Sequence, residues 1–396
     1  MPELAVFILP NPRPPSPARD MATATCRESL FGQGPGTILH QVASAGVTVG
    51  EILQMDHRPY LALVWDDELL APPGWAEGLI AVLQAVPGVA AVGPVSCLAE
   101  IPEQICSPVV SYQTRWGFLD FAAQVDQSAA GRSTPVSGLD PFLILYRRRA
   151  LAALPISTPV AQIPYAISLT GWTFYLAGGV YVHRSGDHHA FVRPELAALV
   201  PNSAKIILDI GCAKGALGHY LKERQDVYVV GVEANEHLAG PAKDYLDEVW
   251  PTKLEDLTED WTDRYDCIIL GDVLEHMVDP WAALNLVRPW LRPEAPLILS
   301  LPNVGYWEIV AGLLAGQWEY LPLGIMDVTH LRFFTAATIT TILNDCGFRI
   351  ERLTRQQVPL SLAGERFIDT LAQTGQELDP MSLCSPSLTV VAKRRE

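Results

Sequence analysis

The segment of residues 205–218 constrains the fold of this chain more than any other stretch. It reads KIILDIGCAKGALG, so an apolar run ends in Asp209 and passes through a turn with Gly211 and Gly215 before a helical pattern begins. Glycine permits positive φ and a close approach of the backbone to a ligand. A buried strand that leads through such a turn into a helix is typical of a nucleotide-binding α/β fold.

A second apolar run strengthens this interpretation. Residues 226–233 read DVYVVGVE and end in Glu233, 22 residues after Gly211. An acid at about this separation is where a ribose-binding carboxylate stands in dinucleotide-binding sheets. Two strands that each end in an acid therefore predict a site for an adenosine cofactor.

Three further motifs indicate which adenosine cofactor this is. They are GDVLEHMVDPW at residues 271–281, SLPNV at residues 300–304 and GIMDVTHLRFFT at residues 324–335. With these motifs, residues 195–396 resemble the class I S-adenosylmethionine-dependent methyltransferases. The resemblance implies a Rossmann-like sheet of seven strands with helices on both faces, and S-adenosylmethionine as the cofactor.

The apolar runs agree with an α/β protein of two domains. A change of composition at residues 184–204 predicts a boundary between a first domain, residues 1–190, and a second domain, residues 191–396. In the second domain, helical segments separate most of the strands, and the last two strands should form an antiparallel edge. The expected strands lie near residues 205–210, 227–232, 248–251, 266–271, 296–301, 348–354 and 387–393.

The resemblance also assigns a cofactor site. Asp209 and the backbone that follows it would meet the methionine end of the cofactor, whose ammonium group suits a carboxylate. Glu233 would accept hydrogen bonds from both ribose hydroxyls. Lys253 stands where the family usually has Asp, so Glu255 or a backbone carbonyl would receive the adenine amino group. The expected cofactor-binding residues are Asp209, Gly211, Cys212, Gly215, Glu233, Ala234, Leu254, Glu255, Gly271 and Asp272.

Two histidines are candidate general bases. His276 follows the fourth expected strand, and a neutral imidazole near pH 7 can take the proton of an acceptor hydroxyl. A structural role at the start of a helix is the alternative for His276. His330 is the second candidate base, in a loop that precedes a helix cap at Thr335. Arg332 in that loop could hold an acceptor carboxylate or phosphate, or pair with Asp327.

An insertion at residues 303–323 is expected to shape the acceptor site. Asn303 and Trp307 are candidate substrate-binding residues, and Trp318 and Tyr320 add aromatic faces that suit rings or sugars. A lid helix that packs its aromatic side chains on the sheet is the alternative interpretation.

The first half of the chain has a different pattern. A strand at residues 60–65 ends in an acid triplet, a helix follows at residues 76–85, and apolar runs follow at residues 89–94, 138–150 and 171–183. This order of pieces resembles the second part of a family-2 glycosyltransferase domain of the GT-A fold. In that family the triplet holds a divalent metal against a sugar-nucleotide diphosphate. The matching residues here are Asp66, Asp67 and Glu68, and His183 falls where the family often has a histidine.

Two departures predict that this first domain is degenerate and not catalytic. The positions at which such transferases carry the acids of their catalytic base hold Pro159, Val160 and Gln162. The amino-terminal nucleotide-binding half is also expected to be short, because a proline-rich stretch at residues 10–17 stands where a strand-helix-strand unit belongs.

Composition excludes several classes of function. The net charge of −16 disfavours nucleic acid as a substrate, because phosphate binding needs clustered Lys and Arg. No apolar run reaches the roughly 18 residues needed to span a bilayer, and the amino terminus lacks the basic residues of a signal peptide, so we expect a cytoplasmic protein. The seven cysteines lack CxxC spacing, which predicts free thiols without a zinc site. The sequence indicates no oligomeric state.

These features predict a methyltransferase that modifies a small molecule or a glycan precursor, with a hydroxyl oxygen as the acceptor. The glycan is suggested only by the sugar-transferase-like first domain. A bifunctional enzyme that transfers both sugar and methyl groups is one alternative. A cofactor-binding scaffold without catalysis is another, favoured only by Ala213 and Lys253 within the cofactor motifs.

Overall fold

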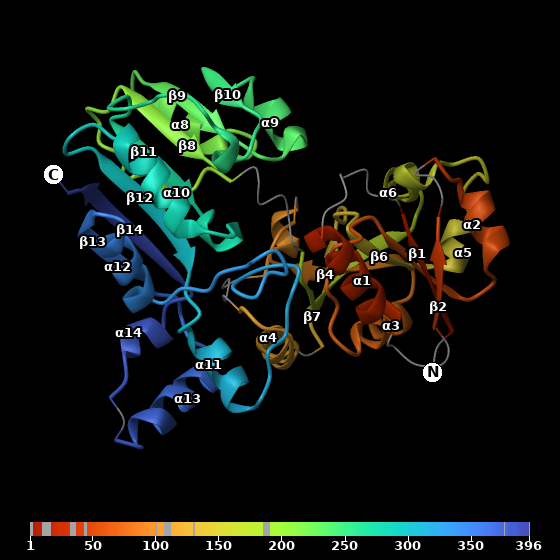
Figure 1. Cartoon of the computed structure of the whole chain (residues 1–396). Helices are drawn as coiled ribbons and strands as arrows, with labels where there is room; N and C mark the ends of the chain where they lie inside the picture. The colour runs from red at the N-terminus through yellow and green to blue at the C-terminus, as the bar shows by residue number, and fades with distance from the viewer. Residues whose placement is uncertain are drawn as a thin grey trace. The chain divides into compact units, whose positions relative to one another are not determined.

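The chain divides into two compact units, Met1–Gly186 and Asp187–Glu396 (Figure 1). Residues 185–190, which belong to the expected domain boundary, lie outside the described residues. The computed structural model describes residues 3–9, 17–31, 37–42, 46–99, 101–106, 112–129, 131–184, 191–375 and 377–395.

The second unit contains one mixed sheet. Its described strands are β8 (Ile206–Ile210), β9 (Tyr228–Val232), β10 (Glu248–Trp250), β11 (Cys267–Gly271), β12 (Pro296–Pro302), β13 (Phe348–Gln356) and β14 (Ser387–Arg394). They lie in the order β10-β9-β8-β11-β12-β14-β13. The strands β8 to β12 run parallel to their neighbours among themselves, whereas β14 is antiparallel to both β12 and β13. The seven expected strands and the antiparallel edge are therefore confirmed.

Helices cover both faces of this sheet because its central strands are apolar on both sides. On one face, Leu208 belongs to the same apolar cluster as α10 (Pro280–Val287) and α12 (Ala336–Asp345). On the other face, Ile207 packs in a cluster with α7, α8 and α9. The bounds of these three helices are Pro194–Ala197, Ala216–Arg224 and Glu236–Ala242.

Three more helices of the second unit are α11 (Trp307–Leu314), α13 (Leu362–Ala372) and α14 (Pro380–Leu383). The first two contact each other and lie together below the sheet in the view of Figure 1. A 3₁₀ turn at Leu274–His276 stands where the sequence predicted the start of a helix, and α10 begins four residues later, at Pro280. Among the described residues, no helix is both long and apolar enough to cross a lipid bilayer.

The parallel register brings the carboxyl ends of four strands to one edge of the sheet. Asp209 of β8 pairs with Gly231 of β9 and with Ile269 of β11, and Gly271 of β11 pairs with Ser300 of β12. The strand order reverses at β8, which has β9 on one side and β11 on the other. Because ligands of open α/β sheets bind in the crevice at such a reversal, the fold places both expected acid-tipped strands at a binding edge.

The first unit contains a second mixed sheet, in the order β2-β1-β3-β6-β4-β7-β5. Its described strands are β1 (Leu4–Ile8), β2 (Thr37–Gln41), β3 (Tyr60–Val64), β4 (Val89–Ser96), β5 (Ser133–Val136), β6 (Leu143–Arg147) and β7 (Thr173–Val182). Its described α-helices are α1 (Pro17–Phe31), α2 (Val49–Met55), α3 (Trp75–Ala85), α4 (Arg115–Ala129), α5 (Arg148–Leu151) and α6 (Ile163–Ser168).

The amino-terminal half of the first unit differs from the prediction. β1 is followed by α1, and both β2 and β3 run parallel to β1, so a complete strand-helix-strand unit is present. The expectation of a shortened half was therefore wrong. Residues 10–16 of the proline-rich stretch lie outside the described residues, and Pro17 begins α1, where its fixed φ and missing N–H are tolerated.

The close packing of α8 on the sheet can be tested at Gly218. A Cβ at this position would lie 2.3 Å from Leu246 Cδ2 and 2.9 Å from Val229 Cγ1. We predict that Gly218→Ala lowers the free energy of unfolding of the second unit by about 1–3 kcal/mol, because overpacking outweighs the gain in helix propensity.

Gly312→Ala is the matched control, since Gly312 is also a helical glycine of the second unit. The nearest atom to a Cβ there would be Gln317 O, at 3.6 Å. In urea unfolding followed by circular dichroism, this variant should be as stable as the natural protein or more stable by up to about 1 kcal/mol. A Gly218→Ala variant of unchanged stability would contradict the packing argument.

Candidate active site

The turn after β8 has the backbone conformation that the sequence predicted for a ligand cradle. Gly211 and Gly215 have φ values of +71° and +81°. A Cβ on Gly211 would lie 2.5 Å from Val273 Cγ2, so only glycine fits at this point. Ala213 also has a positive φ, +48°, which is unusual for a residue with a side chain.

Glu233 holds this turn in place. Its Oε2 accepts a hydrogen bond of 2.9 Å from the backbone N–H of Ala213, and its Oε1 accepts one of 2.8 Å from Asn235. The carboxylate is buried at the end of β9. It therefore joins the turn after β8 to the start of α9, and its bond to Ala213 stabilises the strained conformation there.

Asp209 is a buried carboxyl at the same edge. Burial and, to a smaller extent, the charge of Glu233 raise its pKa to about 7, although the charge of Arg193 opposes them. A positive group placed beside Asp209 would favour the ionised form. The site therefore suits a ligand that carries a cationic group.

Arg193 is a residue of this edge that the sequence analysis did not identify. Its Nη1 lies 2.5 Å from Oδ2 of Asp272, and its Nη2 donates to Ser300 Oγ at 3.0 Å. Ser300 Oγ in turn donates to the other oxygen of Asp272 at 2.8 Å. Arg193 and Asp272 both have positive φ, +56° and +54°. Asp272, expected to bind the cofactor, thus has both oxygens engaged by protein groups.

The other expected cofactor residues lie along the same edge or beside it. Cys212 is buried, and a Cβ on Gly231 would lie 2.6 Å from its sulfur, so the thiol packs against β9. Leu254 is buried in the apolar cluster under β9, whereas Ala234 and Glu255 are exposed. Gly271 is the last residue of β11.

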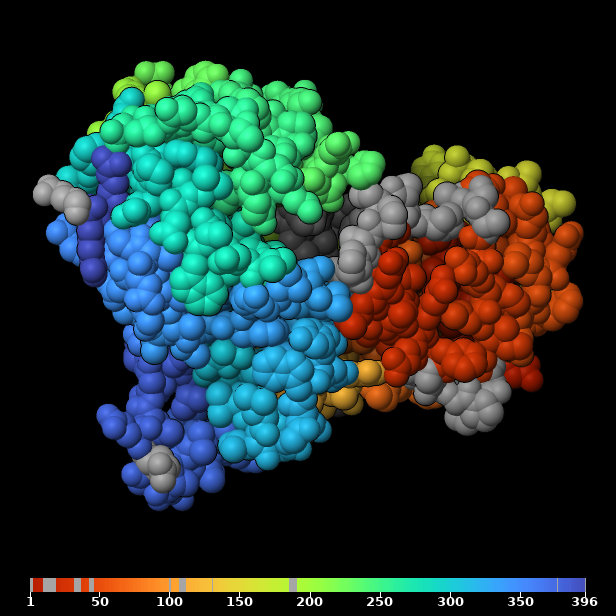
Figure 2. All heavy atoms as spheres, viewed as in Figure 1, coloured from red at the N-terminus to blue at the C-terminus, as the bar shows by residue number. Residues whose placement is uncertain are grey.

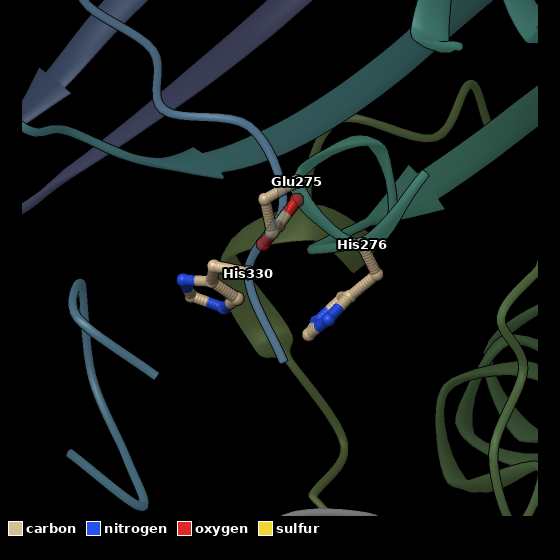
Figure 3. A group of neighbouring side chains, drawn as sticks. All are labelled: Glu275, His276 and His330. Atoms are coloured by element: carbon tan, nitrogen blue, oxygen red, sulfur yellow. The ribbon is translucent and has the colours of Figure 1, made fainter. Parts of the chain in front are cut away.

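The side chains of Glu275, His276 and His330 meet beyond the end of β11. Each offers a ligand atom within 4.8 Å of those of the other two, and the two imidazole centroids are 4.7 Å apart. Figure 3 shows the carboxyl group of Glu275 with an imidazole on either side. Carboxylate and imidazole are also ligands that Zn²⁺ accepts, so the trio has the donor types of a metal site.

Backbone hydrogen bonds explain why two motifs distant in sequence meet here. The carbonyl oxygen of Glu275 accepts from the N–H groups of Leu331 and Arg332, at 2.7 and 3.0 Å. These bonds tie the 3₁₀ turn after β11 to the loop before α12. The two segments adjoin at the surface in Figure 2, where they are green-cyan and light blue.

Each imidazole is fixed by a backbone carbonyl. Nδ1 of His276 lies 3.2 Å from Thr329 O, and Nδ1 of His330 lies 2.9 Å from Ile325 O. A carbonyl only accepts, so the proton stands on Nδ1 of both rings and Nε2 is the basic atom. Desolvation and the neighbouring His330 lower the pKa of His276, which keeps this ring neutral near pH 7.

Glu275 is the fully buried member of the trio. The residue is 1% exposed, and neither of its carboxyl oxygens has a hydrogen-bond partner among the described residues. Burial, with the charge of Asp272, raises its pKa well above the usual value. Burial therefore favours the neutral form of this carboxyl group.

The residues expected to bind the acceptor fall in different environments. Asn303 is fully buried, and its amide nitrogen donates to the carbonyl oxygens of Ser382 and Ser385, at 3.0 and 2.7 Å. Trp307 is buried on α11, and its ring centroid is 6.0 Å from that of Phe367. These contacts favour a structural role for both residues.

Arg332 is exposed and donates to the carbonyl oxygen of Val278 at 2.5 Å. Asp327, its alternative partner in the sequence analysis, instead accepts from the backbone and hydroxyl of Thr329 at 2.8 and 2.6 Å. The guanidinium group therefore stands at the surface of the loop that carries His330.

An aromatic cluster adjoins the histidines. The ring of Phe333 lies 5.1 Å from Trp318, 6.5 Å from Tyr320 and 6.5 Å from His330, centroid to centroid. Trp318 and Tyr320 are 43% and 42% exposed, so part of each face is open to a ligand. Two aromatic residues of the predicted insertion thus stand beside His330, joined to it through Phe333.

The acid triplet of the first unit is paired with arginines. Asp66 is buried, and its Oδ2 lies 3.1 Å from Nε of Arg184, while its Oδ1 accepts from the N–H of Glu68 at 3.1 Å. Arg19 lies 3.6 Å from Asp67 and 3.5 Å from Glu68. A divalent metal would have to displace both guanidinium groups to use these carboxylates.

Comparison with known proteins identifies the second unit. Residues 185–353 match a family described as a methyltransferase domain. The ubiquinone biosynthesis O-methyltransferase of Cereibacter sphaeroides is 27% identical over 165 residues, which cover 39% of this chain and 64% of that protein. The enzyme of the same name from Coxiella burnetii is 25% identical over 158 residues, 38% of this chain and 66% of that protein. The chain thus spans slightly less than two thirds of either relative.

A solved structure, an S-adenosylmethionine-dependent methyltransferase of Archaeoglobus fulgidus, is 18% identical with a TM-score of 0.37. The match covers 49% of this chain and 87% of that one. Residues 185–353 are an S-adenosylmethionine-dependent methyltransferase domain, with S-adenosylmethionine as the methyl donor. The resemblance inferred from the sequence motifs is confirmed for this domain.

The arginine pairing of the acid triplet generates a prediction for the first unit. We expect Asp66 and Asp67 not to bind Mn²⁺ with a dissociation constant below about 1 mM, because Arg19 and Arg184 already neutralise the carboxylates. Calorimetric titration of Mn²⁺ into the natural protein and into Asp66→Asn/Asp67→Asn should give the same heats. A binding isotherm that the double variant loses would instead favour a bifunctional enzyme.

Proposed function

We propose that this protein, whose second unit carries the methyltransferase domain, transfers a methyl group from S-adenosylmethionine to a hydroxyl oxygen of a small molecule or glycan precursor. The observation that carries the proposal is the pair of imidazoles at the cofactor edge, each with Nε2 left basic. The relatives are named O-methyltransferases of ubiquinone biosynthesis, which supports an oxygen acceptor. The glycan acceptor rests only on the analogy of the first unit with sugar transferases.

The cofactor assignment follows from the shape and charge of the edge. The bound cofactor supplies a sulfonium methyl group, so the protein has to orient the acceptor, exclude water and take one proton. We assign the methionine end to Asp209 and the glycine turn, the ribose to Glu233, and the adenine to Leu254 and Glu255. The positive φ values of the turn and the near-neutral pKa of Asp209 fit a cationic ligand held close to the backbone.

His276 is the proposed general base. It is exposed, whereas His330 is 8% exposed, so the acceptor hydroxyl reaches His276 more easily. Its lowered pKa keeps Nε2 unprotonated at pH 7. His330 then supports the ring of His276 through their edge contact of 4.7 Å.

The acceptor pocket is proposed to include Trp318, Tyr320 and Phe333. Half-exposed aromatic faces bind rings and the apolar faces of sugars, and this cluster lies next to His330. Arg332 remains a candidate for an anionic group on the acceptor, because it stands at the surface of the same loop.

For the first unit, residues 1–190, we propose a degenerate GT-A-like domain without transferase activity. The absence of acids at residues 159, 160 and 162 supports this proposal, as does the pairing of Asp66 with Arg184. Such a domain would still bind a glycan without a metal, while residues 191–396 form the methyltransferase domain.

The base assignment can be tested with His276→Ala. We expect the methyl-transfer rate to fall by about 10²–10⁴, with cofactor affinity unchanged within a few-fold, because a proton acceptor acts in the transition state. The assay would use methyl-labelled S-adenosylmethionine with a panel of phenols and sugars. Raising the pH should partly rescue a phenolic acceptor but hardly a sugar hydroxyl.

His219→Ala is the matched control, since His219 is an exposed histidine on α8 whose side chain is 47% exposed. It should keep the natural rate. If His276→Ala retains full rate while His330→Ala is inactive, the base role belongs to His330. If both variants keep full rate, the reaction proceeds by alignment alone and neither histidine is a base.

The assignment of Asp209 predicts a pH-dependent cofactor affinity. Because the pKa of Asp209 is raised to about 7, the free protein must lose a proton there before it pairs with a cation. Affinity for S-adenosylmethionine should therefore rise about tenfold per pH unit up to about pH 7 and then level off. Calorimetry in buffers of different ionisation enthalpy would measure both the affinity and the proton released.

Asp209→Asn keeps the shape of the side chain but replaces the carboxyl group with an amide that does not ionise. This variant should bind the cofactor more weakly, and its affinity should not change with pH. If the cofactor affinity of Asp209→Asn still changes with pH, the titration of Asp209 is not the cause of the pH dependence.

The raised pKa of Asp209 also has a consequence for stability. The folded, unliganded protein binds the Asp209 proton more tightly than the unfolded chain does, so this contribution to stability is lost as pH rises from about 4 to about 7.

A further inference from the structure

A cluster of nucleophilic and proton-carrying side chains lies in the first unit, outside the methyl-transfer site. Cys97 follows β4 and His183 follows β7, and Sγ of Cys97 lies 3.6 Å from Nδ1 of His183. The hydroxyl of Tyr112 lies 2.5 Å from the same Nδ1 and 2.8 Å from the hydroxyl of Tyr181. A thiol, an imidazole and two phenols therefore share one hydrogen-bonded network.

The imidazole has a second nitrogen that the protein does not use. Nε2 of His183 is buried and has no hydrogen-bond partner among the described residues. A buried polar atom without a partner costs free energy, and such atoms stand where an outside group completes the bonding. The imidazole beside Cys97 therefore has one hydrogen-bonding position that no described residue fills.

Strand pairing brings a second cysteine to this point. Ser96 and Ile105 form a parallel bridge, and the N–H of Cys106 donates to Ser96 O at 2.8 Å. If the parallel pairing is extended by one residue, Cys97 is placed opposite Cys106, and the charge of Cys97 does act on the Cys106 thiol. Opposed residues in parallel pairing are about 4.8 Å apart and point to the same side, which is within the Cα separation that a disulfide needs.

The two thiols differ in their proton affinity. Burial alone would raise the pKa of Cys97, but the hydrogen bond and charge of His183 outweigh it and lower the pKa to about 6. Burial raises the pKa of Cys106, which therefore stays a thiol. Burial also raises the pKa of the other five cysteines: Cys26, Cys212, Cys267, Cys346 and Cys384. Nucleophilic thiolate thus forms at Cys97.

We propose that Cys97 is the reactive thiolate of a peroxide-modified site in the first unit, with His183 as its proton partner and Cys106 as the thiol that resolves it. The proposal is independent of the methyl-transfer reaction. It gives a chemical role to His183, which the sequence resemblance had matched only to a position where the family often has a histidine.

The reaction balances with one peroxide per disulfide. The thiolate of Cys97 attacks one peroxide oxygen, the O–O bond breaks, and the departing oxygen takes the proton of the His183 imidazolium. Cys97 is then a sulfenic acid. The sulfur of Cys106 attacks it, the S–S bond forms, and the S–O bond breaks as hydroxide leaves with the thiol proton as water. Two thiols are oxidised by two electrons, and the peroxide is reduced.

The test uses the full chain and hydrogen peroxide in small excess at pH 7. After the protein is unfolded and the remaining thiols are blocked with a maleimide in denaturant, peptide mapping by mass spectrometry should find a Cys97–Cys106 disulfide, and the other five cysteines should carry the maleimide. Dithiothreitol should restore both thiols. A disulfide between other cysteines, or an unmodified Cys97, would overturn the proposal.

Three variants separate the roles. Cys106→Ser should stop at a sulfenic acid on Cys97, trapped by a 1,3-dione, and Cys97→Ser should leave Cys106 unoxidised. His183→Gln should slow the oxidation of Cys97 at least tenfold, whereas the control Cys384→Ser should not change it. Oxidation of Cys106 in Cys97→Ser, or an unchanged rate in a folded His183→Gln variant, would contradict the assigned roles.

Discussion

The parallel hydrogen-bond register of β8 with β9 and β11 is the constraint on which the second unit depends. It carries Asp209, Glu233 and Asp272 to one edge, where burial and the charge of Glu233 raise the pKa of Asp209. Arg193 supplies positive charge to Asp272 from within the chain. A cationic cofactor would supply it to Asp209 from outside, so one electrostatic arrangement accounts for both the ion pair and the proposed ligand.

The contact between the 3₁₀ turn after β11 and the loop before α12 depends on the backbone of Glu275. Because its carbonyl oxygen receives two N–H groups of the loop before α12, His276 and His330 meet although they are far apart in the chain. Burial raises the pKa of the Glu275 side chain, which favours its neutral form beside His276. The same residue therefore brings the two imidazoles together and leaves the exposed one basic.

Patterns in the sequence predicted those parts of the structure that depend on residues close to one another in the chain. A buried parallel strand is a continuous apolar run with its turn residues directly attached, so β8, its glycine turn and the cap of α12 at Thr335 could be foreseen. Arg193 could not, because its partners lie 79 and 107 residues away. Likewise, Arg184 meets Asp66 across 118 residues, and only the fold shows that the acid triplet is neutralised.

The position of β14 has a consequence for the synthesis of this protein. β14 lies between β12 and β13 although it follows both in the chain. Until β14 leaves the ribosome, β12 keeps an unpaired edge on a strand that carries Leu297, Leu299 and Leu301, and such edges pair wrongly with other chains. Translation at about 5–20 residues per second needs several seconds to pass from β12 to β14, so the edge of β12 stays unpaired for at least that time.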